Sequence, residues 1–382
     1  MNDILEKNQL TQLVTLKFIL MKVKYISKIS KVQELTNKEV ELYEPVTKKF
    51  MFRTNSYYND LIDWSDPNDP IRRLIIPQTE ELLNWGQLDA SEEASYQPIP
   101  GIEHKYSSTV LLLCNDVCAA YCRFCFRKRL FQDDNDEVVK DVSSGIAYIK
   151  EHPEVNNVLL TGGDPLVMST ARIEKIIKQL CEIEHVKNIR IGTKLPAFNP
   201  HRILDDPSLG EMIKTYSKVK QIYGMVHFDH PTELTDLTVS SLKFLQAAGA
   251  TVVNQTPIIA GVNDSPEVMN ELFNKLSFIG IITYYVFACR PTEGNKTYAV
   301  PVEQAYEIFN EAKNNGSGLA KTARFILSHK IGKIEVLGLT EKLILFKCHN
   351  LANNGQNGKI MAFKRNPKAY WFDDYENFEV VI

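Results

Sequence analysis

The feature that most constrains the fold of this chain is a series of short aliphatic runs, each followed by a helical pattern, from Thr109 onward. Runs of this length and composition are typical of buried parallel strands that alternate with helices. Such units form either an open doubly wound sheet or a barrel, and periodicity does not choose between them. Six strands are predicted, at residues 110–113, 157–160, 188–192, 221–226, 251–255 and 281–287.

Helix boundaries between these strands are well marked. One predicted helix carries Val239, Leu242 and Leu245 on one face and stops at Gly249, and the next begins at Ser265, which is followed by a proline. Serine caps a helix N-terminus, and proline suits the first helical position. In both candidate architectures chemistry gathers at the carboxyl ends of the strands.

Three regions differ in pattern. Residues 1–100 read as a helical N-terminal region with loops, and residues 101–313 hold the β/α units. Residues 314–382 form a small strand-rich tail, with strands expected at 334–337 and 343–347, and we expect this tail to cover the active site.

Charge and hydropathy argue against a nucleic-acid binder, a secreted protein and a membrane protein. Lys and Arg total 44 against 47 for Asp and Glu, which disfavours a nucleic-acid binder. The apolar stretch at residues 13–23 is interrupted by Lys17 and Lys22 and lacks a small-residue cleavage site, so it fits neither a signal peptide nor a membrane span. We expect a cytoplasmic protein.

Four of the seven cysteines crowd into twelve residues directly after the first predicted barrel strand. Cys118, Cys122 and Cys125 have the spacing C-x3-C-x2-C, and three thiolates on one loop can hold three irons of a [4Fe-4S] cluster while the fourth iron stays open. Cys114 lies at the strand end, where it is not expected to join a compact loop. A chance cluster, or a zinc site that uses a histidine or Cys114, is the alternative.

This spacing, with an aromatic residue before the last cysteine, resembles the radical S-adenosylmethionine superfamily, and more specifically the lysine 2,3-aminomutase family. The resemblance runs from about Tyr57 to Val302. Its motifs are Asp66-Pro67-Asn68-Asp69-Pro70-Ile71-Arg72, Cys118 to Arg129, Thr161-Gly162-Gly163-Asp164-Pro165-Leu166, Ile189 to Thr193, His227-Phe228-Asp229-His230-Pro231 and Asn254-Gln255.

The resemblance implies an α/β fold, a partial (β/α)6 barrel of the TIM type, with a [4Fe-4S] cluster whose open iron binds S-adenosyl-L-methionine. The reduced cluster then generates a 5′-deoxyadenosyl radical, which abstracts hydrogen from an amino-acid substrate and drives 1,2-amino migration. A flavodoxin- or ferredoxin-type protein is the implied reductant, and a homo-oligomer is a further expectation.

Several residues are candidates for these roles because each lies at or just past a strand end. Gly162 and Gly163 leave room for the backbone to approach a ligand, and Asp164 can accept a hydrogen bond from an amino group. Arg127 matches a family arginine and is expected to clamp a carboxylate, although Arg127 to Arg129 also read as a solvated basic face. The remaining candidates for S-adenosylmethionine contacts are Thr193, His230 and Gln255.

The match to the family's pyridoxal phosphate site is partial. Family members bind this cofactor through a lysine after a glycine-rich loop, and the matching residue here is Lys333, although the glycine run is largely gone. Thr109 stands where the family has an arginine for the cofactor's phosphate. Lys333 also reads as the polar start of a strand. The tail holds only Cys348, so no structural zinc is predicted there.

The two acidic residues that hold the side-chain ammonium of lysine in the family correspond to Arg290 and Ser328. A guanidinium repels an ammonium and attracts a carboxylate. We therefore expect a substrate that is not lysine and that carries an anionic group at this end, as a glutamate-like amino acid does.

Three functional readings stay open. The first is the radical aminomutase, an isomerase. The second keeps the cluster and S-adenosylmethionine without pyridoxal phosphate, as an epimerase, dehydrogenase or deaminase. The third is a non-catalytic iron-sulfur protein, which would not cleave S-adenosylmethionine.

Overall fold

The computed structural model describes residues 23–132, 135–352 and 354–375. Its strands are β1 (Tyr25–Ile26), β2 (Thr54–Asn55), β3 (Ile102–Tyr106), β4 (Thr109–Asn115), β5 (Asn157–Gly162), β6 (Asn188–Thr193), β7 (Gln221–His227), β8 (Thr251–Pro257), β9 (Ile282–Phe287), β10 (Arg324–His329), β11 (Gly332–Leu339), β12 (Leu343–Leu351) and β13 (Ile360–Lys364). Its α-helices are α2 (Asn37–Lys49), α3 (Ser56–Asn59), α4 (Pro70–Ile75), α5 (Ser143–Glu151), α6 (Thr170–Cys181), α7 (Leu195–Phe198), α8 (His201–Leu204), α9 (Pro207–Tyr216), α10 (Asp236–Ala247), α11 (Pro266–Phe278) and α12 (Val302–Asn314).

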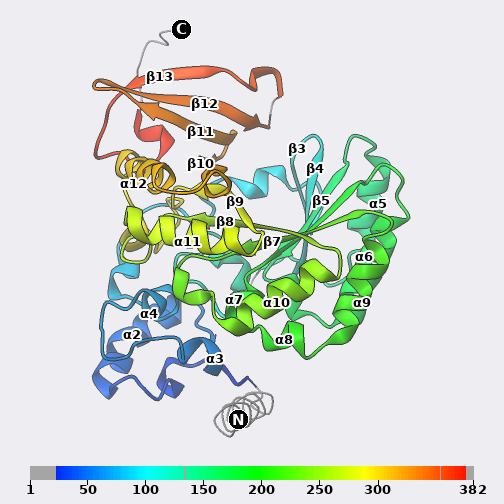
Figure 1. Cartoon of the computed structure of the whole chain (residues 1–382), viewed down its shortest axis with the longest axis horizontal. Helices are drawn as coiled ribbons and strands as arrows, with labels where there is room; N and C mark the ends of the chain where they lie inside the picture. The colour runs from blue at the N-terminus through cyan, green and yellow to red at the C-terminus, as the bar shows by residue number, and fades with distance from the viewer. Residues whose placement is uncertain (1–22, 133–134, 353, 376–382) are drawn as a thin grey trace, which may run out of the picture.

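One sheet organises the chain (Figure 1). It has eleven strands in the order β13-β12-β11-β10-β9-β8-β7-β6-β5-β4-β3. Strands β4 to β10 run parallel, and each pairs with the strands next to it in the chain. A doubly wound sheet reverses its order at a switch point, whereas this one grows in one direction, as in a barrel. Its edge strands are β3 and β13, so in the described part of the chain the barrel stays open, which confirms the partial barrel.

The two faces of the parallel sheet differ in burial. In β6, Ile189 and Ile191 are buried and belong to the main hydrophobic core, which also contains Ile173 and Ile177 of α6. Arg190 and the other alternate residues of β6 are half-buried. Successive side chains of a strand point to opposite faces of the sheet, so one face of β6 packs against the helices and the other forms an inner face that is available for chemistry.

The predicted helix boundaries of α10 and α11 are confirmed. Helix α10 ends before Gly249, whose φ of +103° is in the left-handed region that favours glycine. The hydroxyl of Ser265 accepts a hydrogen bond from the N–H of Val268, and Pro266 opens α11. All six predicted strands are also present, as β4 to β9.

Five strands, β1, β2, β3, β10 and β13, were not predicted from the sequence, and β3 and β10 are the two that adjoin the predicted parallel strands. The edge strand β3 pairs antiparallel with β4, and its Glu103 and Lys105 broke the aliphatic pattern used for the prediction. The strand β10 pairs parallel with β9 and extends the parallel set to seven, so the tail continues the main sheet before β11 to β13 turn antiparallel.

The tail packs with α11 and α12 around a second hydrophobic core, separate from the main one. Buried Trp371 and Tyr375 pack there, as does Phe346 of β12. The N-terminal helices α2 to α4 lie at the opposite end of the molecule from β11 to β13 (Figure 1). Among the described helices, none has the length and apolar character needed to cross a bilayer. Most of the apolar stretch at residues 13–23 lies outside the described residues.

Candidate active site

Three cysteines lie on the loop after β4. Cys118, Cys122 and Cys125 are free of disulfide bonds. Burial raises the pKa of the Cys118 thiol, and so do the nearby charges of Asp164, Cys125 and Cys122. Cys114 instead lies in the main hydrophobic core and donates to the carbonyl oxygen of Thr161 at 3.7 Å. This position argues against Cys114 as a fourth ligand.

The cluster loop is anchored by the N-terminal region. Arg123 is buried, and its guanidinium donates to both carboxylate oxygens of Glu81 at 3.0 and 2.7 Å. Its backbone N–H donates to the carbonyl of Leu74. The N–H of Arg127 donates to the sulfur of Cys125 at 3.4 Å. These contacts anchor the loop that carries the three cysteines to the N-terminal region.

Gly162 and Gly163 let this loop pass over the end of β5. Gly162 has a φ of +109°, and a Cβ there would lie 2.4 Å from the carbonyl oxygen of Asn115. A Cβ at Gly163 would lie 2.6 Å from the carbonyl oxygen of Val117. Both distances are far below van der Waals contact. The backbone that needs these glycines is therefore that of the cluster loop, and close approach to a ligand is not required to explain them.

Asp164 joins the ends of β5 and β6 beside the cluster loop. Its carboxylate accepts hydrogen bonds from the Thr193 hydroxyl at 2.9 Å, from the Lys194 N–H at 2.8 Å and from the Leu166 N–H at 3.0 Å. Burial raises its pKa to about 6, although these hydrogen bonds favour the charged form. Both predicted residues, Asp164 and Thr193, are thus together, and they bond to each other.

A buried ion network lies next to the cluster. The ammonium of Lys194 is 2.7 Å from Asp229 and 2.6 Å from Glu233. Burial acts to lower the pKa of Lys194, but these carboxylates outweigh it and hold the pKa above its ordinary value. The charge of Cys122 also raises the pKa of Lys194. Sequence reasoning missed Lys194.

His227 rather than His230 faces the cluster loop. The His227 ring lies 5.8 Å from the ring of Phe124, and Gln255 is its neighbour across β7 and β8. His230 instead caps the short helix η6 (Pro231–Glu233) through its ring nitrogen. The structure therefore brings Gln255 and His227 toward the cluster, and it gives His230 a local structural contact.

Arg127 sits in a network of buried charges. Its guanidinium donates to Glu93 at 3.2 and 3.3 Å, to Glu103 at 3.1 Å and to the Thr161 hydroxyl at 3.0 Å. Arg129 also contacts Glu93, at 2.9 Å. Burial and the nearby charge of Glu93 raise the pKa of Glu103 to about 7. Arg127 is therefore not part of a basic surface exposed to solvent.

Arg290 and Ser328 meet in the same network. The guanidinium of Arg290 is 3.1 Å from Glu93 and donates to the Ser328 hydroxyl at 3.1 Å. It also lies over the ring of Phe126, 3.7 Å from the ring centre. These three contacts fix its position in the charge network that also includes Arg127.

Lys333, near the start of β11, reaches the same network from the tail. Its ammonium lies 4.5 Å from the centre of the Tyr106 ring and 3.4 Å from the Tyr106 hydroxyl. Burial lowers its pKa to about 7, helped by the positive charges of Arg190, Arg290 and Lys105. A large fraction of this amine is neutral at physiological pH, which an exposed lysine does not achieve.

Arg190 projects from the inner face of β6 with one donor unused. Its Nε is buried and has no hydrogen-bond partner among the described residues. Burial lowers its pKa, against the opposing influence of Tyr284 and Tyr285. A buried N–H of a guanidinium without a hydrogen-bond partner is costly unless an anionic ligand accepts from it. Arg190 was not among the predicted site residues, and the feature of the sequence that could have identified it is a single arginine inside an otherwise apolar strand.

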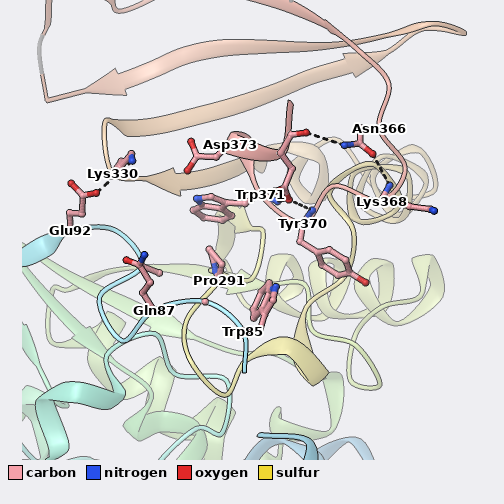
Figure 2. Close-up of a pocket in the computed structure, with 13 residues that line it drawn as sticks. Trp85, Gln87, Glu92, Pro291, Lys330, Asn366, Lys368, Tyr370, Trp371 and Asp373 are labelled. Carbon is pink, nitrogen blue, oxygen red and sulfur yellow. Dashed lines mark hydrogen bonds and ion pairs between the residues drawn. The ribbon is translucent and has the colours of Figure 1, made fainter. Parts of the chain in front are cut away.

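A cavity of about 610 Å³ lies apart from these groups. It opens between residues 85–92, Pro291 and the tail, and Trp85, Tyr370 and Lys330 are among the residues that line it (Figure 2). No predicted site residue lines this cavity. The chemistry-bearing groups instead gather at the carboxyl ends of β4 to β9 and against the inner face of the sheet.

Comparisons with known proteins agree with this arrangement. Residues 112–272 match the Radical SAM superfamily. The "Putative L-lysine 2,3-aminomutase" of Aquifex aeolicus (strain VF5) is 53% identical over 93% of this chain and 95% of that protein. The L-lysine 2,3-aminomutase of Clostridium subterminale is 36% identical over 78% of this chain and 71% of its own length. The glutamate 2,3-aminomutase of Clostridioides difficile is 34% identical over 77% and 69%, respectively.

The family match covers the cysteine loop and most of the parallel strands, and each of these relatives aligns with more than three quarters of this chain. The match supports an enzyme of the isomerase class, with a [4Fe-4S] cluster and S-adenosyl-L-methionine, over a non-catalytic iron-sulfur protein. On this evidence, the chain belongs to the lysine 2,3-aminomutase family of the radical SAM superfamily.

Proposed function

We propose that this enzyme moves the amino group between adjacent carbons of an amino acid whose side chain ends in a carboxylate. The single observation that carries the proposal is the contact between Arg290 and Ser328. These residues occupy the two positions where the family resemblance places acids for the lysine ammonium, and they lie 3.1 Å apart, with the guanidinium held between Glu93 and the ring of Phe126.

The local charge balance supports an anionic substrate. Arg127, Arg129 and Arg290 share Glu93 as a common partner, but Arg127 also pairs with Glu103, and Arg129 with Glu137 and Asp89, so Arg290 is the least neutralised of the three arginines. An ammonium would meet like charge here, whereas a carboxylate can form charge-assisted hydrogen bonds with Arg290. The glutamate 2,3-aminomutase of Clostridioides difficile shows by its name that the family includes an enzyme for an acidic amino acid.

Arg127 is our candidate for the second carboxylate, the one on the α-carbon. Its guanidinium already bonds Glu93 and Glu103, so a substrate carboxylate must share or displace one of them. Glu103 is suited to this because its pKa is raised to about 7, and it can take up a proton as the second anion approaches. Both Arg127 and Arg290 thereby bind the substrate, at opposite ends.

We assign the cysteine trio, Cys118, Cys122 and Cys125, as the ligands of the [4Fe-4S] cluster. When bound, the cluster and S-adenosyl-L-methionine supply the 5′-deoxyadenosyl radical that removes a substrate hydrogen. The residues proposed to line the S-adenosylmethionine site are Gly162, Gly163, Asp164, Thr193, His230 and Gln255. Of the two histidines, His227 has the better position beside the cluster loop. We propose a flavodoxin- or ferredoxin-type reductant, and a homo-oligomer stays a prediction.

The residues around Lys333 fit pyridoxal 5′-phosphate. The amine has a pKa near neutrality, so it can attack the aldehyde, and Arg190 offers a buried donor without a partner for the phosphate. Lys105, whose pKa burial lowers to about 8, adds a second cation in the same network. When bound, this cofactor supplies the electron delocalisation that lets nitrogen migrate between carbons.

One observation favours a second candidate, a radical enzyme of this family without pyridoxal phosphate. Thr109, at the first position of β4, replaces the arginine that the resemblance places at the phosphate. An epimerase, dehydrogenase or deaminase would still need the cluster, S-adenosylmethionine and the carboxylate site at Arg290, but it would leave Lys333 unmodified.

The substrate test is a comparison of glutamate with lysine under anaerobic conditions. The reconstituted enzyme receives S-adenosylmethionine, pyridoxal phosphate and a chemical reductant, and β-amino acid product and 5′-deoxyadenosine are measured. We expect product from glutamate and little from lysine. The matched variant Arg290→Asp should reverse this preference, since it restores an acid at the position. Lysine turnover by the wild type at a rate comparable with glutamate would refute the proposal.

A further inference from the structure

A group of metal-ligand side chains lies outside the radical site. His104 of β3 and His152 at the end of α5 come together with Glu154 of the following turn. One ring nitrogen of each histidine and a carboxylate oxygen of Glu154 lie within 4.8 Å of one another. We propose that these three residues form a zinc site.

Backbone carbonyls set the tautomer of each neutral histidine ring that metal binding needs. The carbonyl oxygen of Ser107, 3.1 Å from His104 Nε2, can only accept, so this nitrogen carries the proton and Nδ1 keeps its lone pair. In the same way the carbonyl oxygen of Tyr148, 2.7 Å from His152 Nδ1, leaves the lone pair on Nε2. Metal-bound histidines usually donate their second ring N–H to such an acceptor, which orients the ring.

Tyr148 packs the two rings against each other. Its ring stacks on His152 at 3.8 Å and meets His104 edge to face at 5.8 Å. Its hydroxyl is 2.8 Å from His104 Nδ1 and can donate to that lone pair. When zinc takes the lone pair, the hydroxyl becomes free to bond a water molecule in the fourth ligand position.

The ligand set selects the metal. Two imidazoles and one carboxylate suit Zn²⁺, whereas Mg²⁺ and Ca²⁺ prefer oxygen ligands only. Tetrahedral zinc with bonds of about 2.0–2.1 Å places its ligands about 3.3 Å apart, so the group must contract. Glu154 is exposed and His152 ends a helix, so both can move the required distance.

The site would fasten the edge strand to the first β/α unit. Glu154 and His152 lie in the turn that leads into β5, at the opposite end of that strand from the cysteine loop. His104 stands between Glu103 and Lys105, which belong to the charge network around Arg127. Zinc at this point would therefore stabilise the position of β3 without contacting the residues of the proposed radical site.

The test uses the enzyme with its iron-sulfur cluster already reconstituted. After exposure to Zn²⁺ and removal of the excess, we expect one zinc per chain in the wild type, at unchanged iron content. Zinc X-ray absorption should show nitrogen and oxygen ligands at about 2.0–2.1 Å and no sulfur at about 2.3 Å. The melting temperature should rise with zinc concentration.

The variant His152→Ala should lose the bound zinc and the thermal shift, and Glu154→Gln, at an exposed position, provides the same test without a risk to folding. The control His201→Ala should keep both. All variants should still form 5′-deoxyadenosine, so failure of the zinc proposal is separate from failure of the proposed function. Equal zinc in wild type and Glu154→Gln, or a sulfur shell around the zinc, would overturn the assignment.

Discussion

The depressed pKa of Lys333 predicts an unusual reactivity toward aldehydes. At a pKa of about 7, roughly half of this amine is neutral at pH 7, against about one in 3,000 for an ordinary lysine with a pKa of 10.5. The neutral fraction of Lys333 should therefore rise about tenfold from pH 6 to pH 8 and then level off, whereas that of an ordinary lysine keeps rising tenfold with each pH unit.

The assay is a short exposure of the anaerobic enzyme to pyridoxal phosphate at each pH, followed by borohydride reduction and peptide mass mapping. Lys194 is the internal control, because it is also buried but is held protonated by Asp229 and Glu233. We expect an adduct at Lys333 with a plateau above pH 8 and none at Lys194. If labelling of Lys333 still climbs tenfold between pH 8 and pH 9, the pKa argument is wrong. A complete lack of adduct, with S-adenosylmethionine cleavage intact, would favour the enzyme without pyridoxal phosphate.

Three further perturbations probe the remaining parts of the site. Arg290→Gln removes a buried charge-assisted contact of about 2–5 kcal/mol, so kcat/KM for the acidic substrate should fall about 30- to 5,000-fold, and an unchanged value would remove Arg290 from the substrate site. Cys118→Ala should abolish 5′-deoxyadenosine formation and the visible absorbance of the cluster, whereas Cys114→Ala should keep both, with iron content as the direct check. Gly163→Ala forces a Cβ to within 2.6 Å of backbone and should lower both melting temperature and iron loading, whereas Gly192→Ala, with 3.6 Å to its nearest neighbour, should change the melting temperature little; equal effects would contradict the packing argument.

The parallel strands could be predicted from the sequence because their helix-covered face is buried and aliphatic, which leaves short apolar runs that local pattern reveals. The edge strand β3 could not, since Glu103 and Lys105 serve the charge network and interrupt that pattern. The strand order then decided between the two architectures, which local periodicity does not encode.

The three cluster cysteines could be identified from the sequence because they lie close together on one short loop. The partners of Arg127 were not, because Glu93 and Glu103 come from distant parts of the chain and are brought in only by the fold. Asp164 was expected to meet a ligand amino group, and the structure shows its oxygens bonded to Thr193 and to backbone N–H groups. Sequence spacing identifies which residues lie at strand ends, but not which of them are already satisfied by neighbours.

The central claim is that a radical made at the cysteine loop drives amino migration in an acidic amino acid held by Arg290. The most direct measurement uses glutamate deuterated at the carbon that receives the amino group, incubated anaerobically with the fully reconstituted enzyme. The account predicts deuterium in 5′-deoxyadenosine together with a β-amino acid product, and loss of both with Cys118→Ala. Unlabelled 5′-deoxyadenosine without β-amino product, while deuterated lysine transfers its label, would contradict it.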